Sequence, residues 1–383
     1  AGGHGRAMKL YWNRGDYDWQ PERYKYSVEQ MMLTLFPGER PEYPEEPAGA
    51  GEDWARFAVT PGEKWVTVTA QVAREGRQAQ GRARFPREKL DEPAEKVYHT
   101  VQHGLKMAFY RAGVTLLGQE PPWGALTGVR PVKLPTRAML AGATPKQAQR
   151  ELERDFRVSP VRASLAVDCA KASLAVDRDL RDDQVSVYIG VPFCPTRCAY
   201  CSFVSADVGR TLKLVEPYLA GVLREIAVTG ESLRRAGKTV HSLYVGGGTP
   251  TTLSASQLSQ LLEAVHRDLP VEHCVEYTVE AGRPDTIDRE KLLALREAGI
   301  GRISINPQTL EDPVLQAIGR RHSAKDILDA YALAREVGFD SINMDLIAGL
   351  PRDSFEGFCR SLNGVLALEP ENITVHTLAL KKG

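Results

Sequence analysis

Beginning near residue 185, apolar segments rich in β-branched residues alternate with amphipathic segments. This alternation predicts a βα series, whose strands lie parallel because a helix connects each to the next. The expected strands are residues 185–191, 242–246, 275–280, 302–306, 341–347 and 372–378, and the expected helices are 216–236, 255–268, 288–298, 323–337 and 354–368. We expect an α/β fold, a partial (β/α)6 TIM-like barrel in which each strand is buried on both faces.

The earlier part of the chain differs in composition, which predicts a separate domain. All five tryptophans lie before residue 124, whereas the cysteine and glycine motifs follow residue 185. Recognisable patterns are hairpin strands at 55–72 and 80–85, a helix at 92–112, and a helix from Thr144 with Gln147 in a capping box. We expect residues 1–180 to form a small α+β domain of unknown role, followed through the charged connector 177–183 by the barrel, residues 181–383.

The charge balance and the cysteine content narrow the class of protein. Lys plus Arg and Asp plus Glu are equal at 49 each, so no global charge favours a nucleic-acid partner. No apolar run reaches the roughly 18 residues of a membrane helix, and the first residues lack the apolar core of a signal peptide. We therefore expect a cytoplasmic protein with no membrane partner. Three cysteines outside the motif, Cys169, Cys274 and Cys359, are expected to be small buried side chains.

Three cysteines lie within eight residues, in the segment Cys194-Pro-Thr-Arg-Cys198-Ala-Tyr-Cys201. Structural zinc takes four protein ligands, usually as two separated pairs, which this spacing fits poorly. Three thiolates on one loop can instead hold three corners of a 4Fe–4S cluster and leave one iron open. An open iron can chelate the amino and carboxylate groups of S-adenosylmethionine (SAM). The motif, with Tyr200 before the last cysteine, resembles that of the radical SAM superfamily; zinc or three unrelated core cysteines are the alternatives.

Further polar residues follow the expected strands and should share one rim. Gly246-Gly247-Gly248 follows the second strand, Glu280 ends the third, Gln308 follows the fourth, and Asp345 lies late in the fifth. The βα loops of parallel barrels converge at the carboxyl ends of the strands, where active sites form. The glycines are either a tight turn or a close approach of the backbone to SAM, and the carboxylates are either solvated strand ends or partners of the ribose or the ammonium group.

Several motifs together resemble the oxygen-independent coproporphyrinogen III oxidase family, over about residues 185–380. They are Tyr188-Ile-Gly-Val-Pro-Phe-Cys194, the cysteine loop, Gly246-Gly-Gly-Thr-Pro250, Arg302-Ile-Ser-Ile-Asn-Pro-Gln308 and Asp345-Leu-Ile-Ala-Gly-Leu-Pro351. Within this family the chain is most similar to the branch called coproporphyrinogen dehydrogenase HemZ, because of Ser202-Phe203 and the early segment Trp123-Gly-Ala-Leu-Thr-Gly-Val-Arg-Pro131.

The resemblance implies a role for each matching residue. Cys194, Cys198 and Cys201 would hold a 4Fe–4S cluster, and the residues contacting SAM would be Tyr188, Gly246, Gly247, Glu280, Gln308, Arg320, Asp345 and Ala379. The Arg320 guanidinium would pair with the SAM carboxylate as a fork, or else be a surface charge like its neighbour Arg321. No further catalytic residue is assigned.

The implied function is the oxidative decarboxylation of coproporphyrinogen III propionates to vinyl groups, giving protoporphyrinogen IX in heme biosynthesis. A flavodoxin or ferredoxin would supply the electron. One departure matters: the family's best-known oxidases carry another cysteine where this chain has Phe203.

Two alternatives therefore stay open: a heme chaperone, with His241, His322 or His376 as iron ligand, and an RNA-modifying radical SAM enzyme. The neutral net charge disfavours the RNA-modifying enzyme. The family also leads us to expect a last barrel helix and a C-terminal domain beyond Gly383, where this sequence ends.

Overall fold

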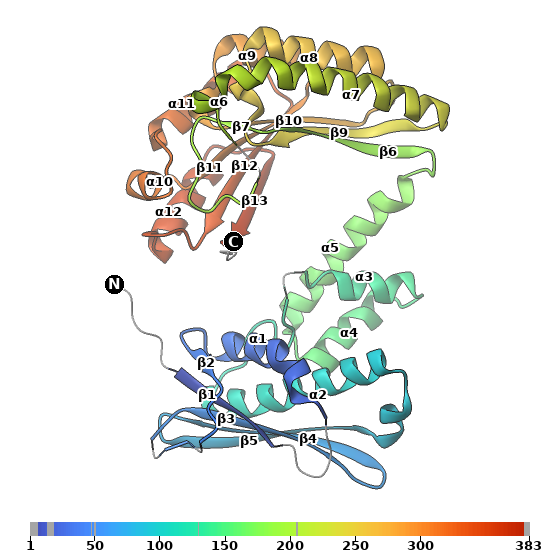
Figure 1. The fold of residues 1–383 in the computed structure, drawn as a ribbon, viewed down its shortest axis with the longest axis vertical. Coiled ribbons are helices and arrows are strands. Elements are labelled where there is room, and N and C mark those ends of the chain that lie inside the picture. Colours follow the sequence, from blue (N-terminus) through green and yellow to red (C-terminus); the bar gives the residue numbers. More distant parts are fainter. Residues whose placement is uncertain are drawn as a thin grey trace. The chain divides into compact units, whose positions relative to one another are not determined.

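The computed structural model describes residues 7–13, 19–46, 48–49, 51–128, 130–203 and 206–378 of the 383-residue chain. Contacts divide the chain into two compact units, Ala1–Leu180 and Arg181–Gly383, which are described separately (Figure 1). Among the described residues, no helix is both long enough and apolar enough to cross a membrane.

The first unit is built on a mixed sheet with the strand order β2-β1-β3-β4-β5. Its strands are β1 (Ala7–Asn13), β2 (Arg40–Glu42), β3 (Trp54–Pro61), β4 (Trp65–Arg74) and β5 (Arg77–Pro86). Its helices are α1 (Lys25–Leu35), α2 (Ala94–Leu117), α3 (Lys133–Leu140), α4 (Pro145–Phe156) and α5 (Pro160–Asp179), with short 3-10 turns at Pro21–Tyr24 and Arg87–Asp91. The alternating apolar side chains of β3, β4 and β5 pack with α1 and α2 in one core, and Leu152 and Val158 belong to a smaller core formed among the later helices.

Local signals in the first unit predicted some elements correctly. The expected hairpin strands and the α2 helix are present, and Thr144 and Gln147 form the predicted reciprocal capping box at the start of α4. The prediction of a charged connector at residues 177–183 is only partly right, because the helix α5 continues to Asp179.

The second unit contains a six-stranded parallel sheet whose strands follow chain order, β6-β9-β10-β11-β12-β13, and curve as a partial barrel (Figure 1). Its strands are β6 (Gln184–Val191), β9 (Thr239–Gly247), β10 (Glu276–Gly282), β11 (Arg302–Gln308), β12 (Ser341–Ala348) and β13 (Asn372–Thr377), with a short pair formed by β7 (Phe193–Cys194) and β8 (Ala206–Asp207). Its helices are α6 (Val208–Thr211), α7 (Val215–Arg235), α8 (Ala255–Asp268), α9 (Arg289–Glu297), α10 (Asp312–Ala317), α11 (Ala324–Val337) and α12 (Phe355–Leu366), with 3-10 turns at Leu212–Leu214, Pro250–Thr252 and Pro284–Thr286. The predicted α/β barrel is therefore confirmed.

The two faces of this sheet differ, and the expectation that each strand is buried on both faces by apolar packing is wrong. In β11, Ile303 and Ile305 are fully buried against the helices, whereas Arg302 and Asn306 line a cavity on the concave face. The strands therefore alternate apolar and polar residues, as a sheet with one hydrophobic face requires.

Helix signals in the second unit worked well, whereas the prediction for the remaining cysteines failed. Ser254 and Gln257 form the expected capping box of α8, and Gly338 ends α11 in a left-handed conformation with φ of +90°.

Cys169 is exposed, and Cys274 and Cys359 are only partly buried, so the prediction of three buried cysteines is wrong.

Candidate active site

A cavity of about 600 Å³ lies at the carboxyl ends of the barrel strands. The loop after β6 contributes three cysteines to its wall, and β9, β10, β11, β12 and β13 all contribute polar residues. This placement agrees with the rule that parallel βα sheets form their sites where the strands end. Segments more than 150 residues apart in sequence thus meet around one space.

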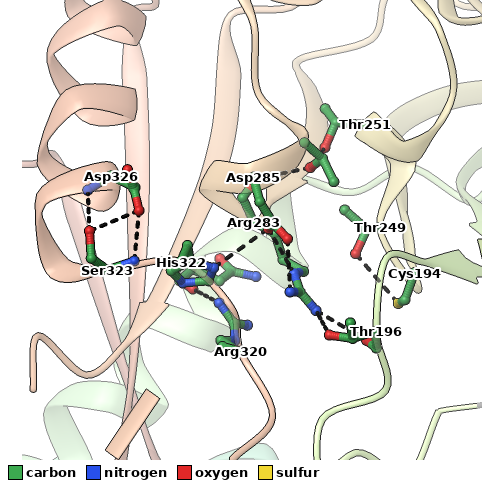
Figure 2. A network of polar contacts seen from close by, with 12 residues as sticks. Cys194, Thr196, Thr249, Thr251, Arg283, Asp285, Arg320, His322, Ser323 and Asp326 are labelled. Carbon is green, nitrogen blue, oxygen red and sulfur yellow. Dashed lines mark hydrogen bonds and ion pairs between the residues drawn. The ribbon is translucent and has the colours of Figure 1, made fainter. Parts of the chain in front are cut away.

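Backbone pairing fixes the start of the cysteine loop against the glycine loop. Gly248 donates to the Val191 carbonyl and Thr249 donates to the Phe193 carbonyl, both at 2.7 Å. A Cβ on Gly248 would lie 2.5 Å from the Phe193 carbonyl oxygen, so this close approach requires glycine. The Cys194 Sγ lies 3.5 Å from the Thr249 hydroxyl, and Figure 2 shows the two side chains facing each other.

The three cysteines of the motif line the same cavity, and none of them forms a disulfide. Within the described part of the chain, no three Cys, His, Asp or Glu side chains converge on a position for a single metal ion. In a 4Fe–4S cluster each thiolate binds its own iron atom, so the ligands need not meet at one point. Three thiols on one loop facing one cavity fit that donor set.

Gly247, which precedes Gly248 in the glycine loop, also has a conformation suited to glycine. Its φ is +107°, and a Cβ there would lie 2.9 Å from the Val191 carbonyl oxygen. Gly246 is packed differently, because a Cβ on it would approach the Glu280 carboxyl and the Tyr188 hydroxyl, each at 3.2 Å. The glycine loop therefore places its backbone directly on the cavity wall at Gly247 and Gly248.

Glu280 lies on the wall of the cavity in an environment that disfavours its charge. Burial raises the pKa of the Glu280 carboxyl, the nearby Asp345 carboxylate raises it further, and a hydrogen bond from Tyr244 opposes the shift. Asp345 itself accepts a 2.7 Å hydrogen bond from the Asn343 side chain. Two carboxyl groups, from β10 and from β12 on either side of β11, thus face one space, where a cationic or hydroxyl-rich ligand would relieve their repulsion.

Gln308 and Arg320 line the same cavity, and each has a buried side-chain atom without a hydrogen-bond partner among the described residues. Gln308 is 7% exposed, has a φ of +68° and leaves its buried side-chain oxygen without a hydrogen-bond partner among the described residues. Arg320 is 5% exposed and donates to the Asn306 carbonyl at 2.5 Å, but its Nε likewise lacks a described partner. A buried polar atom is costly unless it is paired, and a strained backbone is typical of a binding site. Both residues are thus arranged for a ligand.

The structure brings most of the predicted site residues together. The cavity is lined by Cys194, Cys198, Cys201, Gly247, Glu280, Gln308, Arg320 and Asp345. Gly246 and Tyr188 lie beside it on neighbouring strands, and the Tyr188 ring stacks on Tyr244 with 5.8 Å between centroids. Tyr188 is largely exposed and is not among the residues that line the cavity. Ala379 lies outside the described residues.

Sequence reasoning missed several polar residues of the cavity wall. They are Thr196, Tyr244, Thr249, Arg283, Arg302, Asn306, Asn343 and Thr374, whereas His376, which also lines the cavity, had been named only as a possible heme ligand. For the strand residues a usable signal was present, because segments such as Arg302-Ile-Ser-Ile-Asn306 alternate polar and apolar residues. For Arg283 and Thr196 the sequence offered no local signal.

Comparison with known proteins decides the family. The family model described as the Radical SAM superfamily matches residues 188–362 of this chain. Over 346 residues the chain is 38% identical to the oxygen-independent coproporphyrinogen-III oxidase-like protein HemZ of Bacillus subtilis (strain 168), covering 88% of this chain and 68% of that protein. This chain belongs to the HemZ-like family of radical SAM proteins. The predicted superfamily and branch are both confirmed.

Two other similar proteins carry different functions in their names. The heme chaperone HemW of Bacillus subtilis (strain 168) is 37% identical over 198 residues, covering 51% of each protein. Among solved structures, coproporphyrinogen III oxidase HemN from Escherichia coli is 30% identical with a TM-score of 0.48, covering 55% of this chain and 47% of that chain. The chain thus spans about half the length of HemW and of HemN, and about two thirds of HemZ.

Membership of the radical SAM superfamily identifies the cofactors as a 4Fe–4S cluster and SAM. The three thiols fit the cluster, and the orphaned polar atoms of Gln308 and Arg320 fit a charged, polar ligand beside it. The predicted cofactors are therefore confirmed at the level of the family.

Proposed function

We propose that this chain is a radical SAM enzyme that oxidatively decarboxylates porphyrinogen propionates, with coproporphyrinogen III as its substrate. The observation that carries the proposal is the single cavity in which three cysteines meet Glu280, Gln308, Arg320 and Asp345. The similarity to HemZ over most of the chain supports the choice of a porphyrinogen as the substrate class.

We assign the cluster ligands to Cys194, Cys198 and Cys201. The Arg320 guanidinium, whose Nε lacks a described partner, would receive the SAM carboxylate, because its planar fork matches that group. The unpartnered oxygen of Gln308 would accept a hydrogen bond from the same ligand. Glu280 and Asp345 would accept hydrogen bonds from the ribose hydroxyls or the ammonium group of SAM.

When bound at the three cysteines and beside Arg320, the cluster and SAM would supply the one-electron chemistry that removes hydrogen and CO2 from a propionate and leaves a vinyl group, with the electron spent on SAM matched by one released to an acceptor when CO2 leaves. The contribution of this chain is to orient both ligands and to exclude water from the cavity. We propose a flavodoxin or ferredoxin as the donor of the electron.

Arg302 is a further cavity-lining cation, located at the amino end of β11. It donates to the Thr278 hydroxyl at 3.1 Å and faces the Glu276 carboxylate at 3.5 Å. A porphyrinogen of this class carries four carboxylates, so a basic group on the concave face supports its binding.

A heme chaperone is the second candidate, and two observations favour it. HemW shares 37% identity over half of this chain, and Phe203 stands where the best-known oxidases carry a further cysteine. His376 lines the cavity and is exposed, so it is available to ligate heme iron. His322 is unsuited to that role, because its side chain is buried beside Asp285.

An anaerobic assay separates the two functions. Protein reconstituted with iron and sulfide is incubated with SAM, a reductant and coproporphyrinogen III, and the porphyrins are analysed by mass spectrometry. We expect the loss of two CO2 groups and the appearance of protoporphyrinogen IX. Cleavage of SAM without any vinyl product, together with a shift of the Soret band when heme is added, would refute the oxidase and establish the chaperone.

A further inference from the structure

We propose that Arg283 is a positioning residue for the cluster, and that it acts by anchoring Thr196 in the middle of the cysteine loop. This proposal rests on the assignment of the three cysteines as cluster ligands. Arg283 follows β10, three residues after Glu280, and is 3% exposed. It is not one of the residues for which the family resemblance implies a role. Its contacts reach a segment 87 residues earlier in the chain.

The Arg283 guanidinium holds the loop through two hydrogen bonds from one nitrogen. Its Nη1 donates to the Thr196 carbonyl oxygen at 3.0 Å and to the Thr196 hydroxyl at 2.8 Å (Figure 2). Thr196 lies two residues from Cys194 and two residues from Cys198. A fixed carbonyl at this position restrains the backbone on both sides, and so restrains the two thiols.

Asp285 holds the guanidinium in place from the opposite side. Its two carboxylate oxygens accept hydrogen bonds from Arg283 Nε at 3.0 Å and from Nη2 at 2.9 Å, which is a bidentate pair. Although burial alone would raise the pKa of the Asp285 carboxyl, the nearby His322 imidazole and the hydrogen bonds from Arg283 hold it well below its usual range. The pair therefore stays charged, and the desolvation cost of the arginine is offset.

The backbone of Arg283 is fixed as well as its side chain. The Thr286 hydroxyl donates to the Arg283 carbonyl at 2.8 Å, and the Thr251 hydroxyl lies 2.6 Å from that of Thr286. Thr251 in turn donates to the Ala281 carbonyl at 2.7 Å, and the side chains of Thr251, Thr286 and Arg283 are all buried. This chain of contacts connects the glycine loop after β9 to the loop after β10, so the guanidinium is aimed from a rigid base.

The cysteine loop is also tied to the turn that carries Arg320. The Thr196 hydroxyl donates to the Gly319 carbonyl at 2.9 Å, and Ala199 donates to the Ile318 carbonyl at 3.1 Å. Thr196 is therefore the point at which the loops after β6, β10 and β11 meet. Between Pro195 and Cys201 the loop has no helix or strand of its own, so these bonds define its conformation.

The first test measures thiol reactivity in protein without iron. Because the bonds of Arg283 to the loop are charge-assisted, we expect Arg283→Gln to speed iodoacetamide alkylation of Cys198 and Cys201 about tenfold, through more frequent local opening. Cys359 serves as the internal reference and should react at an unchanged rate. In Arg283→Lys the side chain keeps the positive charge but lacks the planar guanidinium, so this variant should give a smaller increase in the alkylation rate.

Matched variants keep this test decisive. Arg296→Gln removes another arginine that pairs with an aspartate, Asp340 at 2.9 Å, and should leave the alkylation rates of Cys198 and Cys201 as in the wild type. Thr196→Val removes the hydroxyl but not the carbonyl, and should raise both rates moderately even if Arg283→Gln does not fold. Wild-type rates in folded Arg283→Gln and in Thr196→Val would overturn the proposal.

A second readout uses reconstituted protein and does not depend on turnover. We expect iron to leave Arg283→Gln faster than the wild type when a chelator is added, with Arg296→Gln unchanged. If the wild type takes up no iron and sulfide, the cluster assignment fails, and the alkylation rates still report whether Arg283 positions the loop. Equal iron loss from Arg283→Gln and wild type would contradict the anchoring role.

Discussion

The Tyr244 hydroxyl donates a 2.6 Å hydrogen bond to the Glu280 carboxylate on the wall of the cavity. This bond favours the ionised form of a carboxyl whose pKa is raised by burial and by Asp345. If Glu280 accepts hydrogen bonds from SAM, then the affinity for SAM must fall as the pH decreases through that raised pKa. The Tyr244 hydroxyl should therefore set the pH range in which SAM binds.

Replacing Tyr244 with Phe should move this pH dependence in a defined direction. Loss of the donor raises the pKa of Glu280 further, so the acidic limb of SAM binding should shift upward by about one pH unit. Calorimetric titration of SAM between pH 5 and pH 8 measures the shift. Tyr277 lies on the helix-covered face of β10, the strand of Glu280, so Tyr277→Phe should leave the acidic limb of SAM binding in place. An unshifted limb in Tyr244→Phe would show that Glu280 does not contact SAM.

The cysteine assignment predicts the outcome of a single substitution. Cys198→Ala should abolish the brown colour of reconstituted protein and all cleavage of SAM, because a cluster held by only two thiolates is not retained. Cys359→Ala, outside the cavity, should keep both. The check is the iron and sulfide content together with the yield of 5′-deoxyadenosine. A fully loaded, SAM-cleaving Cys198→Ala protein is incompatible with the ligand set.

Arg320 should be sensitive to replacement by lysine even though the charge is kept. A lysine cannot present a planar fork, so Arg320→Lys should weaken SAM binding by about tenfold to a hundredfold. Its neighbour Arg321 is exposed, and Arg321→Lys should bind SAM as the wild type does. Isothermal titration of reconstituted protein compares the two variants. Equal affinities would place the SAM carboxylate elsewhere.

Gly248 offers a test of the close approach between two loops. In Gly248→Ala the new Cβ would lie 2.5 Å from the Phe193 carbonyl oxygen, so the second unit should lose about 2 kcal/mol or more of stability. Gly221→Ala, inside α7 with no atom within 4 Å of its Cβ position, should instead stabilise that helix by up to about 1 kcal/mol.

The two units can be followed separately in this experiment. All five tryptophans lie in the first 123 residues, so tryptophan fluorescence reports the first unit and circular dichroism reports both. During urea unfolding, the midpoint followed by tryptophan fluorescence should stay constant in both glycine variants. The midpoint followed by circular dichroism should move to lower urea in Gly248→Ala and to higher urea in Gly221→Ala. Unchanged unfolding of Gly248→Ala would mean that the two loops do not approach as closely as described.

Much of the barrel was predictable because its signals are local. Helix α8 runs over Ala255–Asp268, as expected, since the Ser254 cap and the apolar spacing are properties of one short segment. By contrast, α1, α3 and α5 of the first unit were not predicted. The fold class follows from the alternation of strands and helices, which needs no knowledge of how distant segments pack.

The candidate site was only partly predictable, for a physical reason. The order of the strands implied that Cys194, Glu280 and Asp345 would reach one rim, because parallel strands end on the same side. The alternation of polar and apolar residues in β11 separates Arg302 from Ile303, but nothing local indicated that Gln308 would take a positive φ or that the polar face would line a cavity. Those features depend on the curvature of the sheet and on contacts between loops.

The sequence alone determined the alternation of elements, their ends and the spacing of three thiols, since each depends on neighbours along the chain. Only the tertiary structure decided which polar side chains share the cavity and that Arg283 reaches back to Thr196. A guanidinium is buried only where a carboxylate and a carbonyl surround it, and here the carbonyl of Thr196 comes from a segment 87 residues away. That coincidence of distant groups is created by packing, so it cannot be seen until the chain is folded.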